Sequence, residues 1–172
     1  MEVMEAIRAR RSVRRFLDRP VPREAVETLI EALRWAPSAG NLQSRFFYFV
    51  FDAAVRKRVA EASFGQMFIS TAPLVAVVCA DLHRVSRRYG QRGVELYAVQ
   101  DAAVAVENMM LEALELGLSS VWVGAFDEAA LSAALDLPGR LRPVAVVPIG
   151  YPAHSPAPPP RLERDDIVKI VG

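Results

Sequence analysis

The first residues that could do chemistry are arginines near the start of the chain. Residues 1–23 contain seven arginines and three acidic residues, a local charge of +4. Arg10, Arg11 and Arg14 lie close together, and Ser12 adds a hydroxyl between them. Guanidinium groups bind phosphate oxygens bidentately, so this run suits a phosphate clamp. The same composition also suits a solvated basic face or a nucleic-acid patch.

A second candidate is the segment 36–43, which reads APSAGNLQ. It follows a predicted helix and precedes a predicted strand. Small residues with Pro37, Ser38, Asn41 and Gln43 among them are typical of a loop that presents amide and hydroxyl groups to a flat polar ligand. An ordinary helix-capping turn would have a similar composition.

The third candidate is the segment 117–126, which reads GLSSVWVGAF. A glycine at the end of an apolar strand, here Gly124, permits a ligand to approach the backbone closely. The alternative interpretation is a strand exit with Trp122 in the core.

Side-chain nucleophiles and metal ligands are scarce. The chain has one cysteine and two histidines. Cys79 lies in an apolar strand pattern, which favours a buried structural thiol. His83 and His154 lack partners at ligand spacing, so no metal site is expected. The sequence offers no obvious catalytic acid, base or nucleophile.

The elements that must position these segments follow from apolar periodicity and capping residues. Apolar residues at helical spacing, bounded by Pro22 and Pro37, predict one amphipathic helix. A long Ala-rich stretch that ends at Gly117 predicts a buried helix with a glycine cap. Apolar runs predict the strands. The expected helices are Val3–Ala9, Pro22–Trp35, Ala53–Ala62, Tyr97–Leu116 and Asp127–Leu135, and the expected strands are Phe46–Phe51, Leu74–Cys79, Ser119–Val123 and Val144–Ile149.

Composition restricts the class of protein. The 172 residues are 52% hydrophobic and 24% charged, which excludes a disordered chain and indicates a single domain. The net charge of +1 argues for neither a nucleic-acid nor a membrane partner. No signal peptide or membrane span is expected, so the expected location is the cytoplasm. Residues 152–172 begin with a proline-rich stretch and are expected to form an extended C-terminal arm.

Taken in order, these segments resemble the nitroreductase family of FMN-dependent oxidoreductases. The resemblance extends over essentially the whole chain, 1–172. It rests on residues 10–16, on 36–43, on Ala72-Pro73 before an apolar strand, on residues 101–108 in the long helix, on Gly117-Leu118 with Trp122-Val123-Gly124, and on Ile149-Gly150-Tyr151-Pro152. It implies an α+β fold with a mixed, mostly antiparallel sheet flanked by helices. It also implies an intertwined homodimer whose C-terminal tail pairs with the partner's sheet.

The resemblance also implies which residues bind the FMN. Arg10, Arg11, Ser12 and Arg14 would hold the phosphate and ribityl chain, with Arg161 as a late phosphate ligand. Pro37, Ser38, Asn41 and Gln43 would come from the other protomer. The backbone of Trp122, Val123 and Gly124 would lie along the isoalloxazine. The sequence departs from the family pattern at three positions. Larger members often have an acidic residue at the position of Val123, and many have an amide side chain at the position of Gly65, where the adjacent Gln66 would substitute. A lysine that is usual in the family is replaced by Pro159.

The implied activity is NAD(P)H-dependent reduction of a flat acceptor, such as a nitroaromatic or a quinone, by ping-pong hydride transfer through FMN. The flavin would carry the redox chemistry, and the protein would supply orientation and electrostatics. Two alternatives stay open. The same flavin fold could serve a dehydrogenase, a reductive dehalogenase or a flavin-fragmenting enzyme. Residues 1–23 could instead form a non-enzymatic basic module that binds nucleic acid.

Overall fold

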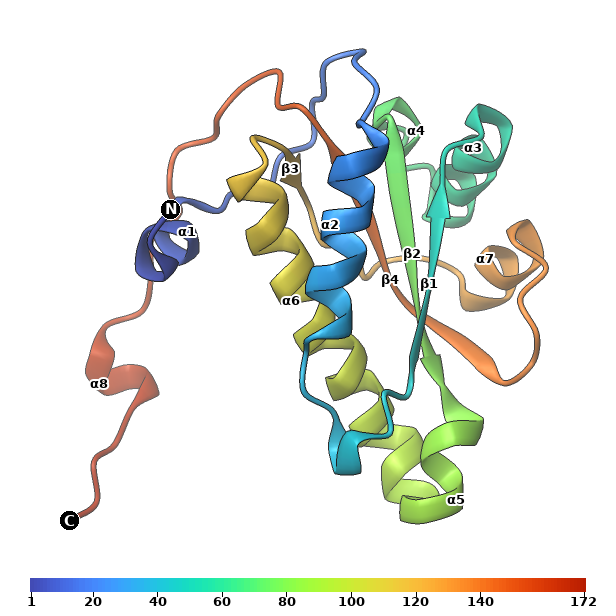
Figure 1. Cartoon of the computed structure of the whole chain (residues 1–172), viewed down its shortest axis with the longest axis vertical. Helices are drawn as coiled ribbons and strands as arrows, with labels where there is room; N and C mark the ends of the chain where they lie inside the picture. The colour runs from blue at the N-terminus through green and yellow to red at the C-terminus, as the bar shows by residue number, and fades with distance from the viewer.

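The computed structural model describes residues 1–172 and contains one antiparallel sheet with helices on both faces (Figure 1). The strand order is β1-β2-β4-β3, and every neighbouring pair of strands is antiparallel. This arrangement confirms the predicted α+β class. The strands are β1 (Arg45–Val50), β2 (Leu74–Asp81), β3 (Ser119–Ser120) and β4 (Leu141–Gly150).

Two layers of helices cover the sheet. Helices α2 and α6 pack on one face, and α3 and α7 pack on the other with the short α4 beside them (Figure 1). The helices are α1 (Val3–Ala9), α2 (Arg23–Arg34), the 3₁₀ turn η1 (Ala39–Asn41), α3 (Ala53–Ala62), α4 (Phe68–Thr71), α5 (Leu82–Arg92), the π-helical turn η2 (Gly93–Tyr97), α6 (Ala98–Glu115), α7 (Glu128–Ala134) and α8 (Arg164–Ile167). No helix of the chain has the length and apolar character that a bilayer span requires.

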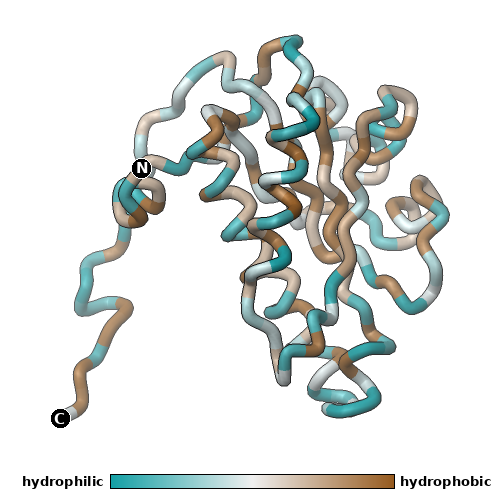
Figure 2. The backbone as a smooth tube through the Cα atoms, in the orientation of Figure 1, coloured by the Kyte–Doolittle hydropathy of each residue, from teal (hydrophilic) through white to brown (hydrophobic).

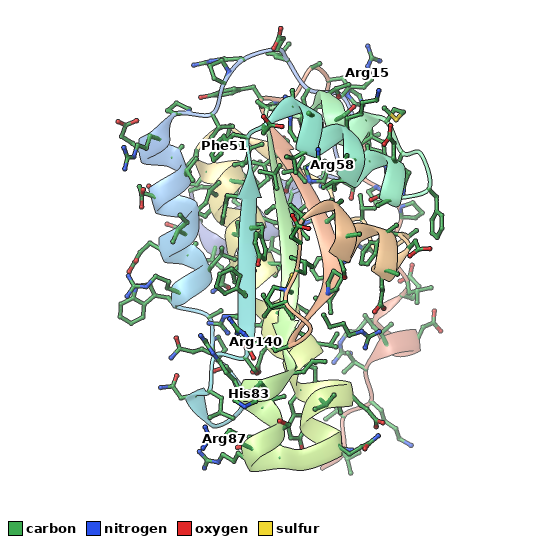
Figure 3. All side chains as sticks on the ribbon, turned by 90° about the vertical axis from the view of Figure 1, so that its right-hand side faces the viewer. Arg15, Phe51, Arg58, His83, Arg87 and Arg140 are labelled. Carbon is green, nitrogen blue, oxygen red and sulfur yellow. The ribbon has the colours of Figure 1, made fainter.

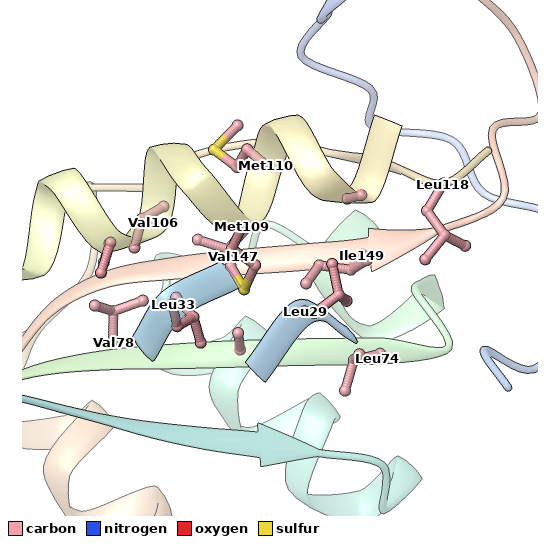
Figure 4. Close-up of a cluster of buried hydrophobic side chains, with 14 of the residues drawn as sticks. Leu29, Leu33, Leu74, Val78, Val106, Met109, Met110, Leu118, Val147 and Ile149 are labelled. Carbon is pink, nitrogen blue, oxygen red and sulfur yellow. The ribbon is translucent and has the colours of Figure 1, made fainter. Parts of the chain in front are cut away.

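The central strand β2 explains the two cores. All its residues are buried, as the run of apolar residues predicted. Leu74, Ala76 and Val78 enter the core under α2 and α6, whereas Val75 and Val77 enter the opposite core. This alternation follows from the two-residue period of a strand. Figure 4 shows the first core, where side chains of α2 and α6 meet those of β2 and β4.

Helix α6 confirms the predicted buried helix and its glycine cap. It begins at Ala98, one residue later than predicted, because the π-helical turn η2 precedes it. At its end Gly117 has φ +72° and donates its N–H to the Leu114 carbonyl at 3.0 Å, while Leu118 donates to Ala113 at 2.8 Å. These two bonds form a Schellman motif, which satisfies the last carbonyls of the helix.

Two local predictions need correction, and one helical region was not predicted. The predicted strand Ser119–Val123 pairs with β4 only at Ser119–Ser120, and again at a single bridge between Val123 and Val146. Pro148 lies opposite the gap and has no N–H to donate, which accounts for the interruption. Helix α2 begins after Pro22, with the proline at the N-cap position. The sequence pattern predicts no element for residues 82–96, where α5 and most of η2 form.

The last residues extend away from the body. Residues 162–172 are all exposed, and the C-terminus lies far from the sheet (Figure 1). The alternating apolar residues here include Ile170 and Val171, which are 75% and 85% exposed. Figure 2 shows this segment switching between hydrophilic and hydrophobic colours along its length. The short helix α8 interrupts the extended course that the sequence predicted for the arm.

Candidate functional site

The arginines of the N-terminal run line a groove together with the C-terminal arm. The groove has a volume of about 300 Å³. Four guanidinium groups come together here although residue 161 is remote in sequence from the others, and no carboxylate is among the lining residues. The lining residues are Arg10, Arg11, Ser12, Arg14, Pro156, Ala157, Pro159 and Arg161.

Pairing with the edge of the sheet holds the arginine run in place. Ser12 forms a parallel bridge with Ser120, and Val13 donates its N–H to the Ser120 carbonyl at 3.1 Å. Val13 is only 2% exposed, while Ser12 and Arg14 on either side of it are exposed. In an extended segment alternate side chains point to opposite sides. Burial of the valine therefore turns its two neighbours outward.

A second set of contacts fixes the chain after the arginines. Leu17 donates its N–H to the Tyr151 carbonyl, and Ala153 donates to the Arg15 carbonyl, both at 2.9 Å. A Cβ at Gly150 would lie 2.6 Å from Cδ of Pro73, so only glycine fits at the end of β4. The start of the C-terminal arm therefore runs beside residues 15–17.

The charge in the groove is largely uncompensated. Arg10 has one acidic neighbour, the exposed Glu107, with 3.9 Å between Nε and Oε1. Arg11 donates to the carbonyls of Arg8 and Arg10 at 2.6 and 2.9 Å. Exposed ion pairs at such distances contribute little. A phosphate group would complement these guanidinium groups through charge-assisted hydrogen bonds.

Next to this groove lies the segment that contains Trp122 and Gly124. Both residues are exposed, whereas Val123 is 5% exposed and exchanges hydrogen bonds of 2.9 Å with Val146. Gln66 donates to the Ala125 carbonyl at 3.0 Å and to the Ser63 carbonyl at 3.0 Å. The amide of Gln66 thus ties the loop after α3 to the strand exit.

An aromatic ring links this segment to the arginines. The Arg14 guanidinium lies 5.9 Å from the centre of the Phe68 ring, a cation–π distance. Phe68 begins α4, two residues after Gln66. The predicted residues near the N-terminus, at Gln66 and at 122–124 therefore lie on one side of the molecule.

The predicted loop residues Pro37, Ser38, Asn41 and Gln43 lie elsewhere. Their loop is tied to the first turn of α6, where Ala39 donates its N–H to Asp101 at 2.8 Å. The arginine run joins the sheet beyond the opposite end of α6. The Arg10 side chain still approaches Glu107 on α6 at 3.9 Å, and Glu107 is six residues, about 9 Å, from Asp101 along the helix. Within one chain no hydrogen bond or ion pair joins the loop to residues 10–14.

The loop itself has an unusual backbone. Gly40, Asn41 and Gln43 all have positive φ, at 55°, 56° and 51°. Ser38 stabilises the turn, because its Oγ accepts the N–H of Gln43 at 2.9 Å. Non-glycine residues in this region of φ are uncommon and are often found at functional sites. Pro37, Asn41 and Gln43 are exposed, so they are available to a ligand or a second chain.

Two buried charged residues, Arg45 and Asp101, hold this loop, and the sequence pattern did not predict this role for either. Arg45 is 7% exposed and donates to the carbonyls of Ala36 and Pro37 at 2.7 and 3.0 Å. Burial lowers the pKa of Arg45, and the nearby Asp101 carboxylate opposes that shift. The signal that could have revealed Arg45 is a charged residue at the head of an otherwise aromatic strand.

The chain's one cysteine lies away from this region. Burial raises the pKa of the Cys79 thiol to about 12, and the thiol lies inside the core. A thiol with so high a pKa is a poor nucleophile. The chain contains no group of three or more His, Cys, Asp or Glu residues that could hold a metal ion. What the site offers is positive charge, exposed backbone and an aromatic ring.

Comparisons with known proteins place this arrangement in a family. The nitroreductase family matches residues 7–151. The NADH dehydrogenase of Thermus thermophilus is 30% identical over 98% of this chain and 95% of its own length. The FMN reductase (NAD(P)H) of Bacillus subtilis is 31% identical over 96% of this chain and 72% of its own.

A solved structure gives the same result. The NADPH:FMN oxidoreductase from Vibrio harveyi, complexed with NAD⁺, matches with a TM-score of 0.89 and 26% identity, over 97% of this chain and 76% of that chain. Both the sequence pattern and the fold thus extend over nearly all of the protein. The chain belongs to the nitroreductase family.

Proposed function

We propose that this protein is an FMN-dependent oxidoreductase that takes a hydride from NADH or NADPH and reduces a flat acceptor such as a nitroaromatic or a quinone. The observation that carries the proposal is the groove where four guanidinium groups meet without a lining carboxylate. The names of the relatives from Bacillus subtilis and Vibrio harveyi, which are an FMN reductase and an NADPH:FMN oxidoreductase, support it.

The residues of the groove fit the phosphate end of FMN. In the proposal Arg10, Arg11, Ser12, Arg14 and Arg161 bind the phosphate and ribityl chain, because guanidinium and hydroxyl donors match phosphate oxygens. The fit rests on the donor set: several positive charges face one groove, and their single acidic neighbour, Glu107, is 3.9 Å from Arg10 and exposed.

The neighbouring segment fits a flat ring system. In the segment Trp122–Gly124 the exposed positions are Trp122 and Gly124, and Gly124 has no side chain, so a planar ring can approach closely. Gln66 would contribute a polar edge beside it, since its side chain already contacts the Ala125 carbonyl. These four residues are therefore proposed to bind the isoalloxazine.

The loop residues Pro37, Ser38, Asn41 and Gln43 are proposed to reach the flavin from a second copy of the chain. Within one chain they lie beside the first turn of α6, whereas the arginine run joins the sheet at Ser120, beyond the other end of that helix. In this homodimer residues 1–172 form one domain per copy, and 152–172 form an arm whose exposed tail packs on the partner's sheet. The apolar residues Ile170 and Val171 would then be covered.

When bound, FMN would supply the hydride-accepting and hydride-donating chemistry of the reaction. The chain's arginines would stabilise negative charge that develops during reduction, which is most effective where water is excluded. The exposed face beside Gly124 would receive the nicotinamide donor first and the acceptor after the donor leaves. No side chain of the protein would form a covalent bond with either substrate.

The visible spectrum of the purified protein tests this proposal. Protein supplied with FMN should turn yellow, and NADH or NADPH should bleach it under anaerobic conditions. Arg10→Ala should raise the Kd for FMN at least tenfold, which is about 1.4 kcal/mol or more. Arg23→Ala removes the same charge from the exposed start of α2 and should leave the Kd within twofold.

The outcomes separate the alternatives. Unchanged FMN affinity in Arg10→Ala would refute the arginine clamp. A protein that binds no FMN and instead retains DNA in a salt-dependent manner would favour the basic binding module. Bound FMN that neither nicotinamide bleaches would point to a different flavin reaction on the same fold.

A further inference from the structure

Helix α5 carries a concentration of positive charge that the proposed flavin site does not use. Its four arginines are Arg84, Arg87, Arg88 and Arg92. The helix is largely hydrophilic along its length (Figure 2), and only Val85 is buried. Figure 3 shows Arg87 at this end of the molecule together with His83 and Arg140.

The carboxylates near α5 leave much of this charge unpaired. The buried Asp81 is shared by Arg84, at 3.3 Å, and Arg140. Glu95 accepts a hydrogen bond from Gln91. Arg87 and Arg88 are exposed and have no carboxylate oxygen within 4.0 Å.

Arg88 lies directly against the loop 37–43, which is proposed to reach the flavin bound by the second copy. A Cβ placed on Gly40 would lie 2.6 Å from the Tyr89 hydroxyl and 3.0 Å from Arg88 Nη1. One turn earlier, Arg84 donates to the carbonyl of Gln43 at 3.0 Å. Residues four apart share a helix face, so Arg84 and Arg88 both face the loop. Arg87 is about 100° away around the helix.

Aromatic rings hold these guanidinium groups in place. Arg88 lies 5.5 Å from the centre of the Tyr89 ring, and Arg92 lies 5.5 Å from that of Tyr97. The two tyrosines pack edge to face at 5.2 Å, and Arg92 donates to the Tyr97 hydroxyl at 3.0 Å. An arginine positioned in advance loses less side-chain entropy when it binds an anion.

We infer that Arg88 binds a phosphate group of the nicotinamide dinucleotide. The inference rests on the proposed function, in which the loop 37–43 of one copy lies beside the flavin of the other. The contacts of Gly40 and Gln43 with α5 bring Arg88 to the mouth of that site. A nicotinamide placed over the flavin carries its phosphates outward, and an unpaired guanidinium at the mouth complements them.

Substrates with and without phosphate test the inference. For Arg88→Gln we expect a rise of about tenfold in KM for NADH, NADPH or both, with kcat within twofold. The KM for 1-benzyl-1,4-dihydronicotinamide, a hydride donor without phosphates, should not change. An equal rise in KM for NADH and NADPH would show that Arg88 contacts the diphosphate that both dinucleotides share. A rise for NADPH alone assigns it to the 2′-phosphate.

A matched variant on the same helix controls for the loss of charge. Arg87→Gln removes one charge from the neighbouring position, which does not face the loop, and should change each KM less than twofold. An unchanged dinucleotide KM in Arg88→Gln would overturn the inference. So would an equal rise for the phosphate-free donor, because that result would indicate a disturbed loop.

A binding measurement separates this inference from the proposed function. Calorimetric titration of the protein with NAD⁺ and NADP⁺ should show weaker binding to Arg88→Gln than to Arg87→Gln, with a difference that shrinks at high salt. If the wild-type protein binds FMN but binds dinucleotides no better than Arg88→Gln does, the inference about Arg88 is refuted and the proposed function is not. Wild-type protein that binds no FMN refutes the proposed function, and the titration then decides the role of Arg88 separately.

Discussion

Two buried charged side chains determine the shape of the loop that carries Pro37, Ser38 and Asn41. Asp101 is 5% exposed and accepts the N–H of Ala39 and the hydroxyl of Ser44. Arg45 donates to carbonyls at the end of α2. A buried charge is tolerated when hydrogen bonds satisfy it, and both side chains are hydrogen-bonded. The Asp101 charge also raises the pKa of Arg45 against the effect of burial. The loop geometry therefore depends on this pair.

Asp101→Asn tests this dependence. The substitution keeps the shape of the side chain but removes the charge that compensates Arg45, so we expect a loss of about 2–3 kcal/mol in the free energy of unfolding. Urea denaturation measures it. Asp18→Asn, at an exposed position, should change stability by less than about 0.5 kcal/mol. Equal stability of the two variants would show that Asp101 does not compensate Arg45.

At the scale of elements, the arginine run is positioned by strands and helix ends. Ser12 and Val13 pair with β3, and β3 follows directly on the end of α6. Gly117 turns the chain from the helix into the strand. The position of the groove along the sheet edge therefore depends on how α6 ends.

Gly117→Ala should destabilise the protein by about 1 kcal/mol, because an L side chain at φ +72° is strained although no atom lies within 4 Å of the new Cβ. Gly139→Ala is the matched control. Gly139 also has open space around it but lacks a positive φ, so the alanine there should be neutral or slightly stabilising. Melting temperatures of the two variants compare them directly. If both variants melt at the same temperature, the positive φ at residue 117 does not require a glycine there.

At the scale of the whole molecule, an isolated chain leaves large apolar side chains exposed. Trp35 is 79% exposed on the surface near α1 and α6, and Ile170 and Val171 in the arm are 75% and 85% exposed. Apolar surface of this kind marks an interaction site. In the proposed homodimer both regions would be covered by the second copy.

The Ile170→Asp variant tests whether the arm stabilises the dimer. Wild-type protein should sediment at twice the 19.0 kDa of one chain. The charge introduced by Ile170→Asp would be costly to bury, so the Kd for dissociation of the dimer should rise at least tenfold. Lys169→Gln, on the same arm, should leave dissociation unchanged. A variant at Ile170 that stays fully dimeric at every concentration would show that the arm contributes nothing to assembly.

Much of the fold could be predicted because its signals are local. The apolar run of β2 and the glycine cap of α6 each identify an element from neighbouring residues. Helix α5 escaped prediction because only Val85 is buried on it, which leaves almost no apolar period. The length of strand β3 was predicted too long because the interruption comes from the neighbouring strand β4, where Pro148 has no N–H to donate, and not from the residues of β3 itself.

The sequence by itself determined the family resemblance, the class of fold and the residue types that could hold a phosphate, since these depend on local patterns and on the order of short segments. The resemblance implied that Arg161 joins Arg10 and Arg14, and the structure has them in one groove. The tertiary structure alone decided that Arg45 is buried and that the loop 37–43 lies at the far end of α6 beside Arg88. Such placements arise from contacts between residues remote in sequence. The residues next to a charged side chain in the sequence do not indicate which distant residue it will contact in the fold.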